Sequence, residues 1–287
     1  MNVRIWGCRG SVATPGPDTM RYGGNTSCVE VRTTDGVSLV LDAGTGMRPL
    51  GAKLDAEGVR EVHVLLSHLH LDHLQGLGFF RPLFDPEVHV HIWGPPSPVQ
   101  TLEERIALYL SPPLFPVRLS DIPSRVTFHD APEQPVSLGS AQVVAAAVTH
   151  QGPTVGYRIT DGGGSLCYLP DHEPSLGVTL ADLDTDWISG FALAHGVDVL
   201  LHDAQYGDGE YAQHVGWGHS AIEHVVEFAR KAEVGRLVLF HHDPYHDDNE
   251  LDALCELAMT MLGRGEDAVQ LAYEGMQITF GVSEALR

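Results

Sequence analysis

Lysine is scarce in this 287-residue sequence, which contains only Lys53 and Lys231. Acidic residues outnumber basic residues by 38 to 17, so the formal net charge at pH 7 is −21. Such a surface repels the phosphate backbone of nucleic acids, and no basic stripe interrupts it. The charge balance therefore argues against a large polyanionic partner, while a small phosphate ester held by metal ions stays compatible with it.

Paired cysteines, long apolar runs and a secretion signal are also missing. No stretch reaches the roughly 18 apolar residues of a transmembrane helix, and the first residues lack the basic and apolar regions of a signal peptide. We therefore expect a cytoplasmic protein without membrane contact. The cysteines form no Cys-x-x-Cys pair, which is typical of a reduced protein and leaves nitrogen and oxygen as metal ligands. They are Cys8, Cys28, Cys167 and Cys255.

Strand-like and helix-like segments alternate along the chain, and no linker, repeat or low-complexity stretch divides it. Hydrophobic residues make up 43 % of the chain, enough for a large core, and we expect residues 1–287 to form a single domain. The alternation predicts an α/β layered fold. Strands are expected at 29–32, 37–41, 62–66, 88–93, 141–148, 154–160, 166–169, 197–201, 236–240 and 276–281. Helices are expected at 98–110, 181–194, 220–232 and 247–262, with a proline-rich loop at 111–125.

The densest group of metal-ligand residues follows the apolar strand 62–66 directly. Alternate residues of an extended segment point the same way, so His68 and His70 can share one ion. Asp72 and His73 lie beyond, where the chain turns into a helix, and can reach a second ion. Imidazole and carboxylate ligands suit zinc and similar metals. The spacing therefore predicts two neighbouring metal sites rather than one closed structural site.

Four further strand-like runs also end in histidine or aspartate. Ligands of open α/β sheets bind beyond the carboxyl ends of the strands, so these ends indicate one metal centre assembled from distant segments. The residues concerned are His150, Asp171, His202 with Asp203, and His241 with His242 and Asp243. Isolated strand histidines are expected to be packed or solvated instead; they are His63, His89 and His91.

These motifs resemble the metallo-β-lactamase-fold hydrolases over nearly the whole chain. The matching features are the His-x-His-x-Asp-His signature at 68–73, the downstream His150, the later Asp171, a histidine at 241 or 242 and the turn at 42–46. The resemblance implies an αβ/βα four-layer sandwich of two mixed β-sheets flanked by helices.

The resemblance also implies a set of metal ligands. His68, His70 and His150 would hold the first ion, and Asp72, His73 and His241 the second, with Asp171 bridging both. We prefer His241 to His242 because it comes first after the strand. Asp42 would orient a ligand from behind. Zinc is the default expectation for these ligands, although manganese or iron would fit the same set.

Two further segments resemble motifs of the tRNase Z-like phosphodiesterases. His202-Asp203-Ala204-Gln205 is similar to their His-Glu-Ala-Thr motif, and His219-Ser220-Ala221 to their His-Ser-Thr motif. In that branch the second histidine contacts the scissile phosphate and the acid orients it, which assigns these roles to His219 and Asp203. The alternative is that Ser220 merely caps a helix. His172, His214 and His224 belong to no motif and are expected at the surface.

The chain lacks the glycine- and lysine-rich arm with which tRNase Z enzymes grip tRNA, and its charge also argues against tRNA. Residues 7–11 and 23–27 resemble small bacterial phosphodiesterase-like members, whose substrates are cyclic nucleotides or other small phosphodiesters. We therefore predict a dinuclear hydrolase of a small phosphodiester, in which Asp72 orients the attacking water. Two alternatives stay open: hydrolysis of a carboxylic ester, lactone, thioester or sulfate, and a non-enzymatic metal-binding protein. A homodimer also stays open, as does the role of residues 79–125.

Overall fold

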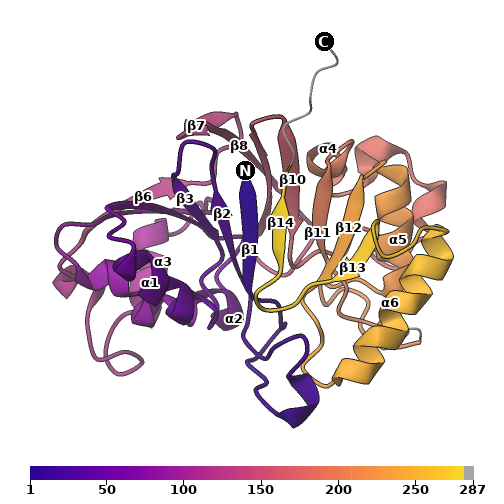
Figure 1. Cartoon of the computed structure of the whole chain (residues 1–287), viewed down its shortest axis with the longest axis horizontal. Helices are drawn as coiled ribbons and strands as arrows, with labels where there is room; N and C mark the ends of the chain where they lie inside the picture. The colour runs from indigo at the N-terminus through magenta and orange to yellow at the C-terminus, as the bar shows by residue number, and fades with distance from the viewer. Residues whose placement is uncertain (208, 281–287) are drawn as a thin grey trace.

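The strands of the computed structural model, which describes residues 1–207 and 209–280, form two seven-stranded sheets (Figure 1). The first sheet has the order β14-β1-β2-β3-β4-β5-β6 and the second the order β13-β12-β11-β10-β9-β8-β7. The strands of the first sheet are β1 (Asn2–Gly7), β2 (Cys28–Arg32), β3 (Ser38–Leu41), β4 (Glu61–Leu65), β5 (His89–Gly94), β6 (Arg125–Asp130) and β14 (Gln277–Thr279). The strands of the second are β7 (Val136–Leu138), β8 (Ala141–Ala147), β9 (Val155–Asp161), β10 (Gly164–Leu169), β11 (Val199–Asp203), β12 (Arg236–Phe240) and β13 (Val269–Leu271).

Helices flank the two sheets on their outer faces (Figure 1). The α-helices are α1 (Met47–Ala56), α2 (Leu71–Leu74), α3 (Leu102–Tyr109), α4 (Phe191–Ala194), α5 (Ile222–Lys231) and α6 (Asp248–Leu262). The short 3₁₀ turns are η1 (Pro17–Thr19), η2 (Leu77–Phe79), η3 (Arg81–Phe84), η4 (Leu119–Asp121), η5 (Leu180–Asp182), η6 (Thr185–Trp187) and η7 (Tyr211–Gln213). None of the described helices is long and apolar enough to cross a membrane.

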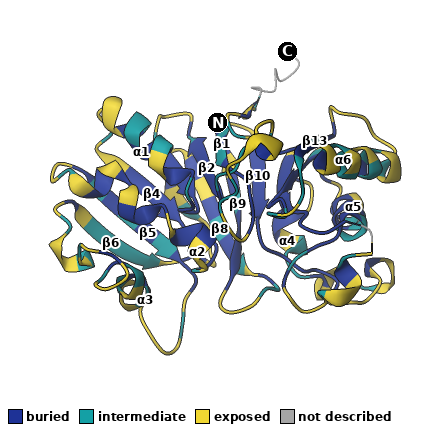
Figure 2. Cartoon of the chain, turned by 90° about the horizontal axis from the view of Figure 1, so that it is seen from below, coloured by how far each residue is buried: buried dark blue, intermediate teal, exposed yellow. Residues whose placement is uncertain are grey.

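Hydrophobic residues form one core between the sheets and one beneath each helical layer. Figure 2 shows these buried residues along the middle of the molecule, with exposed residues concentrated on the outer helices. Helix α5 explains how such a layer forms, because Ile222, Val225, Val226 and Ala229 recur at helical spacing and are all buried. Its outer face is polar and ends in Arg230 and Lys231, which favour the helix C-terminus.

The direction of the strands decides where functional side chains meet. Strands β3 to β6 run parallel to one another, as do β10 to β13. Their carboxyl ends therefore lie along one edge of each sheet. The end of the described chain returns to the start, since β14 pairs with β1 through Thr279 opposite Asn2. The predicted α/β class and the two-sheet sandwich are both confirmed.

Several expected elements differ from those observed. The helix expected at 181–194 is wrong: this stretch contains η5, η6 and only the short α4. The Asp184 side chain accepts a hydrogen bond from the Asp186 amide, and Gly190 takes a left-handed φ of 72°. Both features stop a continuous helix. The edge strand β6 and the short edge strands β7 and β13 were not predicted. The strand expected at 276–281 is β14, and residue 281 lies outside the described part of the chain.

Candidate metal centre

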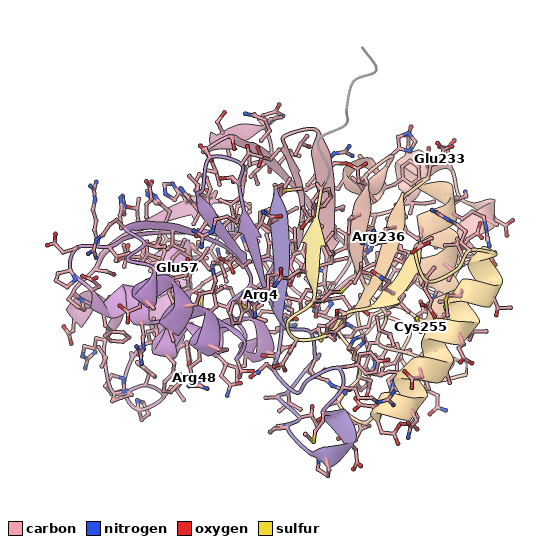
Figure 3. All side chains as sticks on the ribbon, in the orientation of Figure 1. Arg4, Arg48, Glu57, Glu233, Arg236 and Cys255 are labelled. Atoms are coloured by element: carbon pink, nitrogen blue, oxygen red, sulfur yellow. The ribbon has the colours of Figure 1, made fainter. Side chains whose placement is uncertain are left out.

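The segments that follow β4, β8, β10 and β12 bring the predicted ligands together. Arg236, labelled in Figure 3, is the first residue of β12, so His241 lies beyond the opposite end of that strand. The nitrogen and oxygen atoms within each of two groups lie within 4.8 Å of one another. The first group is His68, His70 and His150, and the second is Asp72, His73, Asp171 and His241. We call these seven residues the metal-site cluster.

Asp171 faces both groups with different oxygen atoms. Its Oδ2 atom lies 3.7 Å from His68 Nε2 and 3.6 Å from His150 Nε2. Its Oδ1 atom lies 2.9 Å from His73 Nε2 and 3.4 Å from His241 Nε2. The carboxylate therefore stands between the two groups, in the position expected of a ligand shared by two ions.

Outer hydrogen bonds turn the imidazole Nε2 atoms inward. When Nδ1 donates to an oxygen acceptor, a neutral imidazole keeps its lone pair on Nε2 for a metal. Ser67 Oγ donates to Asp42 and therefore accepts from His68. The four Nδ1 contacts are His73 with Asp42 Oδ2 at 2.8 Å, His150 with the Gly218 carbonyl at 2.8 Å, His241 with Gln205 Oε1 at 3.1 Å and His68 with Ser67 Oγ at 3.0 Å.

The inward-facing atoms fit divalent cations. His68 Nε2 is buried without a hydrogen-bond partner, a costly arrangement that a metal would relieve. Pairs of imidazole nitrogens also face each other at 3.3 Å, in His70 with His150 and in His73 with His241. A cation between two such nitrogens would bind the lone pairs of both. The donor set, imidazole nitrogen and carboxylate oxygen, suits zinc, manganese or iron.

The electrostatics of the cluster also favour positive charge. Burial lowers the pKa of His73, but Asp171, Asp72 and Asp42 outweigh it and raise that pKa well above its ordinary value. Burial raises the pKa of Asp171, but His241, His73 and His68 outweigh it and hold the pKa well below its usual range. The carboxylates therefore stay ionised in a buried place, which a bound divalent ion would stabilise.

Strained and tightly packed backbone supports the cluster. Asp42 and His241 are not glycines, yet they have φ angles of 58° and 59°. Such left-handed residues are costly and are concentrated at functional sites. The Asp42 carboxylate accepts hydrogen bonds from the Ser67 amide and the Tyr168 hydroxyl, so it also joins the two sheets. Gly10 lies so close to the His241 ring that an added Cβ would be 2.4 Å from Nδ1.

His219 and Asp203 form a pair beside the metal-site cluster. His219 Nδ1 lies 2.6 Å from Asp203 Oδ2, and the His219 ring stacks on His241 with centroids 5.0 Å apart. Burial lowers the pKa of His219, but Asp203, followed by Asp171, outweighs it and raises the pKa to about 9. The expected alternative for Ser220 is wrong, because its hydroxyl donates to the His172 carbonyl and α5 has no side-chain cap.

Several other expectations for single residues need correction or addition. His172, expected at the surface, is fully buried and its Nδ1 lies 2.9 Å from His202 Nε2. His242 is turned away from the cluster and bonds the Ala272 carbonyl through Nε2. Sequence reasoning missed Glu173, whose buried carboxylate accepts hydrogen bonds from the Gly216 and Gly218 amides. No motif marks Glu173; its position two residues after Asp171 was the available signal.

A second group of histidines lies on one face of β4, β5 and β6. We call His63, His89, His91 and His129 the strand histidine cluster. The rings of His63 and His91 stack with centroids 4.5 Å apart, and His91 Nδ1 lies 3.1 Å from His129 Nε2. Burial and then His91 lower the pKa of His63 to about 4. The expectation that His63, His89 and His91 are packed or solvated is therefore confirmed, although their mutual contact was not foreseen.

Comparison with known proteins agrees with this geometry. A family model described as a β-lactamase superfamily domain matches residues 38–242. The chain belongs to this family. Among relatives of this β-lactamase superfamily protein, a ribonuclease Z of Mycobacterium sp. (strain KMS) is 28% identical over 259 residues, covering 80% of this chain and 81% of the relative. The uncharacterized protein Rv1339 of Mycobacterium tuberculosis is 32% identical over 213 residues, covering 72% and 68%.

Solved structures share the fold of this β-lactamase superfamily protein at low identity. The metallo-β-lactamase fold protein YhfI from Bacillus subtilis aligns with a TM-score of 0.69 at 20% identity, covering 97% of this chain and 99% of that one. A diphosphatase from the PhnP family gives 0.67 at 18%, covering 98% of both chains. Human tRNase Z, short form, gives 0.65 at 21%, covering 97% and 99%. The shared fold implies divalent metal ions, and the His and Asp groups described above can hold them.

Proposed function

We propose that this metallohydrolase-family protein is a dinuclear hydrolase of small phosphodiesters, such as cyclic nucleotides. His68, His70 and His150 would hold one ion, and Asp72, His73 and His241 the other. Asp171 would be shared between them. The observation that carries the phosphodiester assignment is the His219–Asp203 pair, with its 2.6 Å contact, at the edge of the metal-site cluster.

Bound divalent ions, with zinc as the default and manganese or iron also fitting, would supply Lewis acidity and lower the pKa of a bound water toward 7. Asp72 is the group that we assign to orient this water and take up its proton. The Ser11 amide donates to Asp72 Oδ2 at 2.8 Å, and His241 Nε2 lies 3.2 Å from the same oxygen. These contacts fix one carboxylate oxygen, so we assign the proton to Oδ1.

His219 would bind the phosphoryl group and stabilise the charge that develops on it. Its Nδ1–H donates to Asp203, which leaves Nε2–H as the donor toward the substrate. Burial lowers the pKa of His219, but Asp203 outweighs it and raises the pKa to about 9, which favours the cationic ring. A charged donor that is already oriented is worth most where negative charge increases in the transition state. Asp203 is itself fixed, because it accepts hydrogen bonds from the His172 and Gln205 amides.

The exposure of the cluster is compatible with a small substrate. His70 is exposed while His68, His73 and His241 are buried, so the cluster opens toward solvent beside His70. The net charge of −21 favours a substrate with one or two phosphates over a polynucleotide. Because some relatives are named ribonuclease Z, the test must also include a nucleic-acid substrate.

The proposal is tested by steady-state kinetics of the zinc-loaded and manganese-loaded protein on a panel of substrates. The panel contains cyclic AMP, bis(4-nitrophenyl) phosphate, a lactone, a thioester, a β-lactam and a precursor tRNA. We expect the two phosphodiesters to have the highest kcat/KM, and we expect their hydrolysis to stop when the metal ions are removed by a chelator. Lactone or thioester turnover far above phosphodiester turnover would overturn the proposal. If the precursor tRNA were the one substrate of the panel that is cleaved efficiently, the proposed substrate would have to be a polynucleotide instead of a small phosphodiester.

A further inference from the structure

The segment between His214 and His219 carries an exposed tryptophan next to the metal-site cluster. The Trp217 side chain is 57% exposed. Single exposed aromatic residues are common and need no explanation by themselves. Trp217 is different because its backbone neighbours are bonded on both sides to residues of the site. Its aromatic surface is therefore open to a ligand on an ordered stretch of backbone beside the site.

Glu173 holds the backbone on both sides of Trp217. Its buried carboxylate accepts from the Gly216 amide at 2.8 Å and from the Gly218 amide at 2.7 Å. The carbonyl groups of the same two glycines also have partners: Gln151 Nε2 donates to Gly216, and His150 Nδ1 to Gly218. The backbone on both sides of Trp217 is therefore ordered before a ligand binds, which removes the backbone part of the entropy cost of binding.

Trp217 precedes Gly218, which contacts the metal-site cluster directly. Gly218 lies so close to His150 that an added Cβ would be 2.2 Å from the His150 Nδ1 atom. His219, two residues after Trp217, is the residue proposed to donate a hydrogen bond to the phosphoryl group. The same short segment thus presents a donor for the phosphoryl group and an aromatic surface at neighbouring positions.

A row of aromatic rings packs against Trp217. The His214 ring contacts Trp217 edge-on, with centroids 4.8 Å apart and an interplanar angle of 88°. His214 stacks in turn on Tyr206 at 4.7 Å, and Tyr206 lies 6.0 Å from the His219 ring. Tyr206 is buried, whereas Trp217 is open to solvent. The row therefore connects the Trp217 indole to His219 through packed rings.

We propose that Trp217 stacks on a planar aromatic group of the substrate, so that the preferred phosphodiesters are nucleotides whose base lies against the indole. This inference rests on the proposed phosphodiesterase function and names its substrate class. Stacking of one base on an aromatic side chain is worth about ten- to a hundredfold in affinity. Alkyl phosphodiesters would lack this contribution and bind through the phosphate alone.

The test compares two ligands that differ only in the base, AMP and ribose 5-phosphate. Both are measured as competitive inhibitors of bis(4-nitrophenyl) phosphate hydrolysis by the metal-loaded protein. We expect AMP to bind about tenfold or more tightly in the wild type. Trp217→Ala should weaken AMP alone and bring the two inhibition constants together, while Trp217→Phe should keep most of the difference. Trp187→Ala removes another exposed indole, in η6, and should change neither constant.

A second readout does not depend on activity. AMP should quench tryptophan fluorescence in the wild type and in Trp187→Phe, and the quenching should disappear in Trp217→Phe. If no phosphodiester is hydrolysed, the proposed function fails, and the fluorescence titration still decides whether Trp217 binds a base. Equal inhibition constants for AMP and ribose 5-phosphate in the wild type would overturn the inference, as would quenching that persists in Trp217→Phe. Circular dichroism of each variant checks that it is folded.

Discussion

The described part of the chain contains two groups of histidines that are built in opposite ways. In the metal-site cluster, four imidazoles bond oxygen acceptors through Nδ1 and turn Nε2 toward the buried Asp171 carboxylate. In the strand histidine cluster, the rings contact one another, as His91 does with His63 and His129, without converging on a buried carboxylate. Its nearby carboxylate, Glu61, has a side chain that is 59% exposed.

The difference lies in the outer partners and the charge, not in the number of histidines. Glu61, His63 and His91 also place their ligand atoms within 4.8 Å of one another. However, His63 Nδ1 accepts a hydrogen bond from the Trp93 indole, which puts the ring proton on Nε2 and makes that atom a donor. Proximity alone therefore does not make a metal site; the tautomer must also be fixed with the lone pair inward.

The largest expected effect follows from removing the shared carboxylate. Asp171→Asn should lower the metal content and reduce kcat/KM by about a thousandfold or more, because both groups lose an anionic oxygen. The matched change in the other cluster, His91→Asn, should leave both quantities unchanged. Metal content is measured by elemental analysis after gel filtration. Two retained equivalents of metal and normal turnover in Asp171→Asn would contradict the shared position.

Removal of His219, the proposed hydrogen-bond donor to the phosphoryl group, should lower the reaction rate without lowering the metal content. His219→Ala should lower kcat by about two to three orders of magnitude. Its metal content should stay close to that of the wild type, since His219 is outside the two ligand groups. The measurement pairs steady-state kinetics with elemental analysis. Wild-type activity in His219→Ala would remove the basis for the phosphodiester assignment.

A smaller effect is expected when an outer partner of the metal-site cluster is weakened. Asp42→Asn should reduce metal affinity by about ten- to a hundredfold, because it disturbs the tautomer and orientation of His73. Chelator competition measures this change. Tyr168→Phe is the control, since it removes one hydrogen bond to Asp42 but leaves the contact with His73 in place. An equal loss of affinity in the two variants would indicate a general packing effect.

The smallest effect concerns the pH dependence of stability in the strand histidine cluster. The pKa of His63 is lowered from 6.5 to about 4, first by burial and then by His91. Because the unfolded chain takes up this proton first, the wild type should lose stability as the pH falls from 6.5 to 4. His63→Gln should reduce that loss by a few degrees in Tm. Thermal unfolding curves of the wild type and His63→Gln at several pH values test whether the slope depends on His63.

That the residues of the metal-site cluster lie together was predictable because their signal is local or lies at strand ends. His68, His70, Asp72 and His73 lie within six positions, and His150, Asp171 and His241 each follow an apolar run. The strand histidine cluster was not predictable, because parallel register brings it together. That register pairs His63 with His91 and Trp93 with His129, and it depends on how the apolar faces pack.

The missed elements have similar causes. Strands β7 and β13 are only three residues long, so they carry too little alternation to be recognised. Glu173 was missed because its partners are backbone amides some 40 residues later, and no side-chain motif records such contacts. Trp217 was part of the segment before His219, but its exposure became visible only in three dimensions.

The pairing of β14 with β1 has a consequence for biosynthesis. Residues 277–279 complete an edge that starts with Asn2, and Glu274 holds the Asn25 amide beside the loop that carries Ser11. Until these residues emerge from the ribosome, the first sheet lacks β14 and the Asn25 amide lacks its Glu274 partner. We therefore expect the first sheet to be completed only after residue 279 has been synthesised.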